Sequence, residues 1–281
     1  MIEYIKAIII SLISGVTFAL PVSSAAHFSF TNSVVKFSED TKSLGLYYSV
    51  MAVAFSAVIM ILLRKIYSLC VQSVFDKSKK LENYRRVMKK LLISLVPSIV
   101  LFVPVSKERL LCDLFDNFLA SSNLLMVAIA CVIGALVTVV SVWYTKQSYS
   151  VTKRSADTKT VIRSSLYQIV SYVIPGFSHV TSAGTNMLIC DVESKVIVRE
   201  IYLYIAPQML LVNIIKIIRY VLSDMIINPV MLIICFAVAA LMSAFVVTAM
   251  SKINIRRLLP FFAGYSAFTG VIFAIMSFVL K

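Results

Sequence analysis

The sequence contains two histidines, His27 and His179, and each follows a proline by a few residues in an apolar stretch. An imidazole can transfer a proton near neutral pH, and histidines within membrane segments usually serve a function. The alternative is that both histidines pack between helices and bond to backbone carbonyl groups. Because the two occupy equivalent places and no third histidine exists, we expect both to be functional.

Hydroxyl side chains surround both histidines. At the start of a helix, free backbone N–H groups and hydroxyl groups can together bind a phosphate. The alternative is that these hydroxyl groups only join neighbouring membrane helices. The predicted phosphate-binding residues are Ser23, Ser24, Ser178, Thr181 and Ser182.

Proline interrupts the two apolar stretches that carry these side chains. Residues 5–30 are broken at Pro21, and residues 161–190 are broken at Pro175 and Gly176. The backbone groups freed by such a break cannot face lipid unpaired, so a break at membrane depth lines a polar cavity. We therefore predict two re-entrant helical hairpins, with the two prolines and the glycine as their structural breaks.

The composition places these hairpins in a membrane protein. The 281 residues are 60% hydrophobic and 14% charged, whereas a soluble protein has about 25% charged residues, so a soluble enzyme is excluded. The chain has 27 Lys and Arg residues against 13 Asp and Glu residues. In a membrane protein this excess indicates cytoplasmic loops and no nucleic-acid partner. The cysteines are scattered without a C-x-x-C pair, so neither zinc nor a disulfide framework is expected.

Six further apolar runs approach the length of about 20 residues that a membrane-spanning helix needs. These runs are 44–63, 91–106, 124–143, 197–218, 226–250 and 258–280. The basic segments between them are expected to face the cytoplasm, namely residues 64–90, 146–160 and 251–257. The sequence therefore predicts an all-α, multi-pass protein of the cell membrane with six transmembrane helices and two re-entrant hairpins.

This topology divides a single membrane domain, residues 1–281, into two parts of opposite orientation. Each part, 1–145 and 146–281, is expected to contain one re-entrant hairpin followed by three crossings. Because three is an odd number, the second part is inverted relative to the first. Transporters built on inverted repeats bind their substrates where the broken helices of the two repeats meet. We therefore expect the binding site between the two hairpins.

Residues 14–28 resemble the signature E-G-x-T-E-F-L-P-x-S-S-S-G-H-L of the undecaprenyl-diphosphate phosphatase, or bacitracin-resistance, family. Residues 168–179 resemble its second signature, Q-x-x-x-x-I-P-G-T-S-R-S-G-A-T. The resemblance implies a site at membrane depth that removes one phosphate from undecaprenyl diphosphate, the lipid carrier of cell-wall precursors. It implies a polyprenyl phosphate or diphosphate as the ligand. It also implies catalytic roles for His27 and Ser24, and we expect His179, at a position of the second signature, to act with them.

The sequence departs from the family pattern at three positions that carry chemistry. Ser14 and Phe18 stand where the family has glutamates, and His179 stands where it has an arginine. A neutral imidazole cannot reproduce the fixed bidentate cation of arginine, and without the glutamates a divalent metal is not expected. Three interpretations stay open: a diverged phosphatase that uses both histidines, an inactive relative that binds or translocates a lipid phosphate, and a scaffold without ligand. The sequence is compatible with a homo-oligomer.

Overall fold

The computed structural model of the chain describes residues 2–38, 40–74, 80–106, 109–119, 124–146, 155–223 and 225–279. Within these ranges the chain forms α-helices and two 3-10 helices, without a β-strand. Six of the described helices are long and apolar enough to cross a membrane. The predicted fold class is confirmed: the protein is an all-α, polytopic membrane protein.

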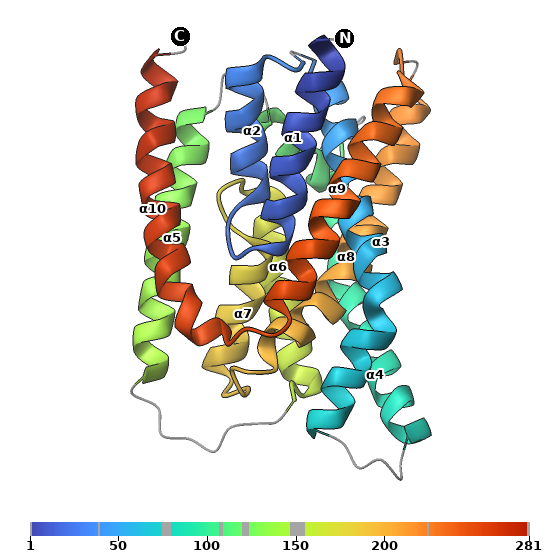
Figure 1. Cartoon of the computed structure of the whole chain (residues 1–281), viewed down its shortest axis with the longest axis vertical. Helices are drawn as coiled ribbons and strands as arrows, with labels where there is room; N and C mark the ends of the chain where they lie inside the picture. Colours follow the sequence, from blue (N-terminus) through green and yellow to red (C-terminus); the bar gives the residue numbers. More distant parts are fainter. Residues whose placement is uncertain are drawn as a thin grey trace.

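The first hairpin consists of α1 (Ile2–Ala19) and α2 (Ser24–Val35). Pro21 lacks a backbone N–H and cannot continue α1. Ser23 then caps α2, because its side chain accepts a hydrogen bond from the backbone N of Ala26. In Figure 1, α2 returns toward the end of the molecule at which α1 begins. Although α1 alone has the length of a spanning helix, the chain turns back at its end.

The second hairpin consists of α6 (Thr158–Val173) and α7 (His179–Ile189). Gly176 has a φ of 121°, which glycine adopts without strain. Ser178 caps α7 by accepting a hydrogen bond from the backbone N of Thr181. This hairpin enters from the end of the molecule opposite to the first one (Figure 1). Both helical hairpins predicted from the breaks are therefore present.

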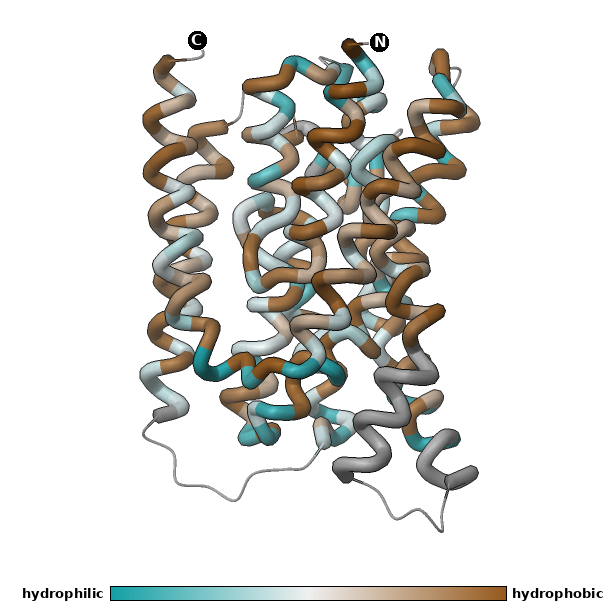
Figure 2. Tube along the Cα trace, in the orientation of Figure 1, coloured by the Kyte–Doolittle hydropathy of each residue, from teal (hydrophilic) through white to brown (hydrophobic). Residues whose placement is uncertain are grey.

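Five long helices match five of the six predicted apolar runs. They are hydrophobic along most of their described length (Figure 2), and many of their apolar side chains lie on the outside of the molecule, as lipid requires. These helices are α3 (Thr41–Val74), α5 (Leu124–Lys146), α8 (Ile197–Val221), α9 (Pro229–Met250) and α10 (Ile255–Val279).

The predicted span at 91–106 is wrong as a single helix. α4 (Lys80–Leu95) passes into the 3-10 helix η2 (Val96–Phe102), and a second 3-10 helix, η3 (Leu111–Phe118), follows. The α-helix ends because Pro97 lacks an N–H group and disfavours the helical conformation of the residue before it. The sixth helix with the length of a membrane span is α1, which the sequence assigns to a hairpin.

The three segments predicted to face the cytoplasm adjoin one end of the molecule. The end of α3, the end of α5 and the start of α10 lie toward the end opposite to the first residues of α1 (Figure 1). Residues 75–79 and 147–154 of these segments lie outside the described residues.

The two parts of the chain pack against each other along their long helices. α10 lies along α5, α8 along α3 and α9 along α1. The order of a hairpin followed by α3, α4 and α5 recurs as a hairpin followed by α8, α9 and α10. Because the hairpins enter from opposite ends, this recurrence supports an inverted repeat. We propose that the second copy of the repeat begins at residue 146.

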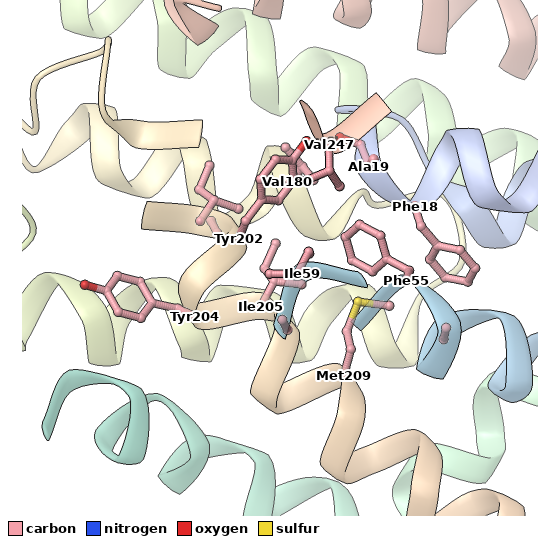
Figure 3. Close-up of a cluster of buried hydrophobic side chains, with 14 of the residues drawn as sticks. Phe18, Ala19, Phe55, Ile59, Val180, Tyr202, Tyr204, Ile205, Met209 and Val247 are labelled. Carbon is pink, nitrogen blue, oxygen red and sulfur yellow. Dashed lines mark hydrogen bonds between the residues drawn. The ribbon is translucent and has the colours of Figure 1, made fainter. Parts of the chain in front are cut away.

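A buried hydrophobic cluster surrounds the tips of the hairpins (Figure 3). Phe18, near the end of α1, stacks on Phe55 of α3 with 5.7 Å between ring centroids, and Phe55 meets the ring of Tyr202 on α8. The hydroxyl group of Tyr202 donates a hydrogen bond to the carbonyl oxygen of Ala19 at 2.7 Å. These contacts fix the end of α1 and thereby the position of the first break.

Candidate functional site

The two helix breaks are joined by hydrogen bonds. Oγ of Ser23 accepts a hydrogen bond from the backbone N of Gly176 at 2.9 Å. In the other direction, Oγ1 of Thr181 donates to the carbonyl oxygen of Pro21 at 2.9 Å. The breaks thus satisfy each other's freed backbone groups, as a polar segment among apolar helices must. The bonded segments, residues 20–24 and 175–182, are called the junction below.

Two helices begin at the junction, with Ser23 and Ser178 as their N-caps. Oγ of Ser178 also donates to the carbonyl oxygen of Leu20 at 3.4 Å, so both capping serines contact the opposite break. A helix N-terminus carries roughly half a positive charge and attracts anions. The junction therefore favours an anion through its backbone, although neither segment contains a lysine or arginine.

All five hydroxyl side chains predicted to bind phosphate lie at the junction, and each already has a partner within the protein. Oγ of Ser24 lies 2.8 Å from the hydroxyl oxygen of Tyr48, and Oγ of Ser182 lies 2.9 Å from Oγ of Ser171. A hydroxyl group can donate and accept at the same time. A phosphate can therefore use these groups by adding to their bonds or replacing them.

A cavity of about 30 Å³ lies beside the junction, between α5, α7 and α10. None of its described lining residues carries a charge. The hydroxyl groups in its wall belong to Thr138, Ser178, Thr181, Ser182, Thr185 and Ser266. This cavity has hydroxyl groups and apolar side chains in its wall but no charge, so the wall can form hydrogen bonds to a phosphate without neutralising it.

His27 is held at both ring nitrogens. Nδ1 lies 2.7 Å from the carbonyl oxygen of Ser23, and Nε2 lies 2.8 Å from the hydroxyl oxygen of Tyr265 on α10. A carbonyl oxygen only accepts, so Nδ1 carries the hydrogen and Nε2 of the neutral ring accepts from the tyrosine. The rings of His27 and Tyr265 are also parallel, with centroids 5.7 Å apart. Nothing in the sequence points to Tyr265 as a partner of His27, because its position on α10 is far from both breaks along the chain.

His179 lies in different surroundings, buried between α6 and α8. Its ring contacts Tyr172 with 4.4 Å between centroids. Nδ1 of His179 and the hydroxyl group of Tyr172 are both buried, and the structure records no hydrogen-bond partner for either. The two histidines therefore face different sides of the junction: His27 faces α10, and His179 faces the interior near α8.

The positions of the family's glutamates are apolar or neutral. Phe18 packs against Phe55 and against Tyr48, and Ser14 is completely buried with no recorded partner for its hydroxyl group. A divalent cation of the hard type needs carboxylate or carbonyl oxygens, and these two side chains do not fit it. Among the described residues, no group of three His, Cys, Asp or Glu side chains could hold a metal ion.

A buried ion pair lies near the end of α8. Nζ of Lys216 is 2.5 Å from Oδ1 of Asp116 on η3, and both side chains are buried. The hydroxyl group of Tyr220 donates to the other carboxylate oxygen, and a second pair joins Arg219 to Asp113. Burial raises the pKa of Asp116, and Lys216 and Tyr220 oppose that rise. Neither residue was among the predicted site residues, although a lysine inside the apolar run 197–218 is a signal for a functional or paired charge.

Replacing Ser23 with alanine is expected to lower the free energy of unfolding by about 2–3 kcal/mol. The change removes an N-cap and leaves the buried N–H of Gly176 without its partner. The measurement is the thermal or denaturant unfolding of the purified protein in detergent. Ser33→Ala is the matched control, because Ser33 only bonds to the carbonyl oxygen of Phe30 in its own helix. Equal losses of unfolding free energy in the two variants would show that the hydrogen bond between the breaks does not stabilise the protein.

Comparisons with known proteins place this chain in a family. The family model of the bacitracin resistance protein BacA matches residues 7–272. An undecaprenyl-diphosphatase of Lacticaseibacillus paracasei is 27% identical over 226 residues, which cover 78% of this chain and 77% of the relative. The enzyme of that name from Lactobacillus delbrueckii subsp. bulgaricus is 23% identical with the same coverage. One from Streptococcus suis is 22% identical over 291 aligned positions, which cover 99% and 98% of the two chains. The chain, an undecaprenyl-diphosphatase-like membrane protein, therefore belongs to the BacA family of bacitracin resistance proteins.

Proposed function

We propose that this protein binds the phosphate head group of a polyprenyl phosphate or diphosphate at the junction. The observation that carries the proposal is the meeting of two serine-capped helix starts at hydrogen-bonded breaks. Helix starts of this kind bind phosphate through their N–H groups and their dipoles. A lipid of this class also agrees with the names of the relatives, which are undecaprenyl-diphosphatases.

We propose that the protein binds or translocates the lipid phosphate and does not hydrolyse it rapidly. Phe18 and Ser14 provide no carboxylate, so neither can activate a nucleophile or hold a metal ion. His179 replaces the arginine of the family signature. The loss of one cation that stabilises the transition state of phosphoryl transfer costs on the order of 10³-fold in rate.

The test compares binding with hydrolysis on the same purified protein. We expect undecaprenyl phosphate to bind at least about tenfold more tightly than undecaprenol, because a charge-assisted hydrogen bond contributes about 1.5–3 kcal/mol. Phosphate release from undecaprenyl diphosphate should be on the order of 10³-fold slower than for the Lacticaseibacillus paracasei relative. Equal affinity for the phosphate and the alcohol would contradict the proposed binding function.

A second candidate function is hydrolysis that depends on His27. The specific observation is the geometry of the ring: the bond from Nδ1 to Ser23 places the lone pair on Nε2, which accepts from the hydroxyl group of Tyr265 and must exchange that partner for a water molecule. In this reaction Nε2 takes a proton from the water that attacks the terminal phosphorus. The bond between that phosphorus and the bridging oxygen breaks, and the products are polyprenyl phosphate and inorganic phosphate.

If this hydrolysis operates, His27→Ala is expected to lower phosphate release by at least about 10²-fold, since a general base contributes about that much. The measurement is the initial rate of phosphate release in detergent, with undecaprenyl phosphate binding as the check on folding. Thr31→Ala serves as the control, because Thr31 bonds only to the backbone of the same helix. A rate that His27→Ala leaves unchanged excludes this mechanism.

We further propose that the protein is a multi-pass protein of the cell membrane with residues 64–90, 146–160 and 251–257 in the cytoplasm. The positive-inside rule and the position of the adjoining helix ends at one end of the molecule support this orientation.

A further inference from the structure

A groove of about 370 Å³ runs along α5 and α10, which lie side by side at one edge of the molecule (Figure 1). The two helices touch along its floor, because a Cβ added to Gly270 would lie 2.9 Å from Cγ2 of Val132 and 3.0 Å from the carbonyl oxygen of Ala128. Every described residue that lines the groove is apolar. These residues lie within 128–133 of α5 and 270–278 of α10, and we call the space between them the α5–α10 groove.

The α5–α10 groove is open and preformed. Ile133 and Phe278 in its walls are both exposed, so the groove opens to the outside of the helix bundle, where lipid surrounds the protein. On another face of α10, the ring of Phe273 stacks on Phe30 of α2, with 4.6 Å between centroids, and meets the ring of His27. These contacts hold α10 in position, so a ligand does not have to order the groove when it binds.

The groove continues into the hydroxyl-lined cavity beside the junction along the same faces of both helices. On α5, Ile133 lines the groove and Val137, one turn further along the helix, lines the cavity. On α10, Gly270 lines the groove and Ser266, one turn before it, lines the cavity. Residues four positions apart lie on one face of a helix. A molecule in the cavity can therefore extend into the groove without passing between helices.

The inner side of the junction offers a long chain much less room. Tyr48 of α3 and Met209 of α8, which lie near His179 on that side, are at most 4% exposed. On the α5 side, Val137 in the wall of the hydroxyl-lined cavity is 47% exposed. A lipid whose head group lies at the junction therefore reaches the hydrocarbon beside α5 and α10.

The adjoining cavity and groove differ in the same way as the two ends of a polyprenyl phosphate. The cavity has hydroxyl groups in its wall and a volume of about 30 Å³, whereas the groove is apolar and has a volume of about 370 Å³. A phosphate requires hydrogen-bonding groups when it leaves water, and a prenyl chain requires none. The groove is also a single channel between two helices, which suits a lipid with one chain better than a phospholipid with two.

We propose that the isoprene units nearest the phosphate of the bound lipid lie in the α5–α10 groove. This inference rests on the proposed function, and it adds the surface that recognises the chain. The helix rises about 18 Å from Ser266 to Phe278 at 1.5 Å per residue, a length that an undecaprenyl chain exceeds, so the far end of the chain stays in the membrane. Because lipid is as apolar as the groove, the chain is held by close packing and adds only moderately to the affinity.

Photo-cross-linking of the wild-type protein tests where the chain lies. The protein in phosphatidylcholine nanodiscs is irradiated with a polyprenyl phosphate that carries a diazirine on an isoprene unit near the phosphate, and mass spectrometry identifies the labelled peptides. We expect the label within residues 128–133 and 270–278, and we expect excess undecaprenyl phosphate to displace it. Label confined to other segments would overturn the inference. A photoreactive phosphatidylcholine that labels the groove and is not displaced by undecaprenyl phosphate would show that ordinary membrane lipid fills it, and would also overturn the inference.

Ala274→Phe tests the groove by filling it. Ala274 lies between Gly270 and Phe278 on the same face of α10 and lines the groove. The matched control is Ala237→Phe, because Ala237 is an exposed residue of the apolar helix α9 outside the groove. The measurement is the equilibrium affinity for undecaprenyl phosphate and for dimethylallyl phosphate, which carries a single isoprene unit.

We expect Ala274→Phe to weaken the binding of undecaprenyl phosphate about five- to tenfold and that of dimethylallyl phosphate by less than about twofold. Ala237→Phe should change either affinity by less than about twofold. An unchanged affinity of Ala274→Phe for undecaprenyl phosphate, or an equal loss for both ligands, would overturn this inference and leave head-group binding at the junction intact. A wild-type protein that binds undecaprenyl phosphate no better than undecaprenol would overturn the proposed function itself.

Discussion

Gly176→Ala is expected to lower the free energy of unfolding by about 3–5 kcal/mol, near the upper limit for a single substitution. The φ of 121° at this position lies in a region that residues with a Cβ rarely adopt. An added Cβ would also lie 2.5 Å from Cβ of Ala130 and 2.7 Å from the backbone N of Cys131 on α5. Because the nearest atoms include the backbone of a packed helix, neither the break nor α5 can adjust at low cost.

The unfolding of detergent-solubilised protein measures this loss, and Gly264→Ala is the matched control. Gly264 lies in α10, and an added Cβ there would have nothing within 4 Å. Alanine favours a helix over glycine by about 1 kcal/mol, so this variant should be as stable as the wild type or slightly more stable. Similar losses of unfolding free energy in both variants would show that the conformation of Gly176 does not contribute to stability.

Asp116→Ala is expected to lower the free energy of unfolding by about 3–5 kcal/mol, because it leaves the buried ammonium of Lys216 without its carboxylate. The hydroxyl group of Tyr220 would lose its acceptor as well. The same unfolding measurement applies. The control is Glu3→Gln, which breaks the exposed pair with Lys6 and should change stability by less than about 1 kcal/mol.

A double variant, Lys216→Met with Asp116→Asn, should be more stable than Asp116→Ala and close to the wild type. Replacing both partners of a buried pair avoids the cost of a single buried charge. If Asp116→Ala were as stable as Glu3→Gln, the lysine would have another effective counter-ion or would reach water.

The sequence predicted the hairpins and five of the six spans because these features depend on local properties. Chain length across a membrane, the missing N–H group of proline and the burial of apolar side chains act within about 20 residues. The prediction of a spanning helix at 91–106 was wrong for a local reason too. It has the composition of a span, but Pro97 ends the α-helix within it and the chain continues as 3-10 turns.

The contacts within the site depend on residues far apart in the chain and could not be predicted in the same way. Nothing near His27 indicates that Tyr265 will meet its Nε2 atom, because the two residues are 238 positions apart. Lys216 and Asp116 are 100 positions apart, and the acid lies outside every predicted span. The sequence showed that the second signature lacks its arginine, because His179 stands at that position. Only the packing of α8 beside α7 showed that Lys216 lies near His179.

The hydrogen bonds between the breaks have a consequence for how the chain is made. The first hairpin leaves the ribosome early. Gly176, whose backbone N–H donates to Ser23, is synthesised 153 residues later. At roughly 5–20 residues per second, that interval lasts about 8–30 s. During this time the carbonyl groups of Leu20 and Pro21 have no partner from the second break. The newly made first hairpin must therefore stay in contact with water, lipid head groups or the insertion machinery until the second half of the protein arrives.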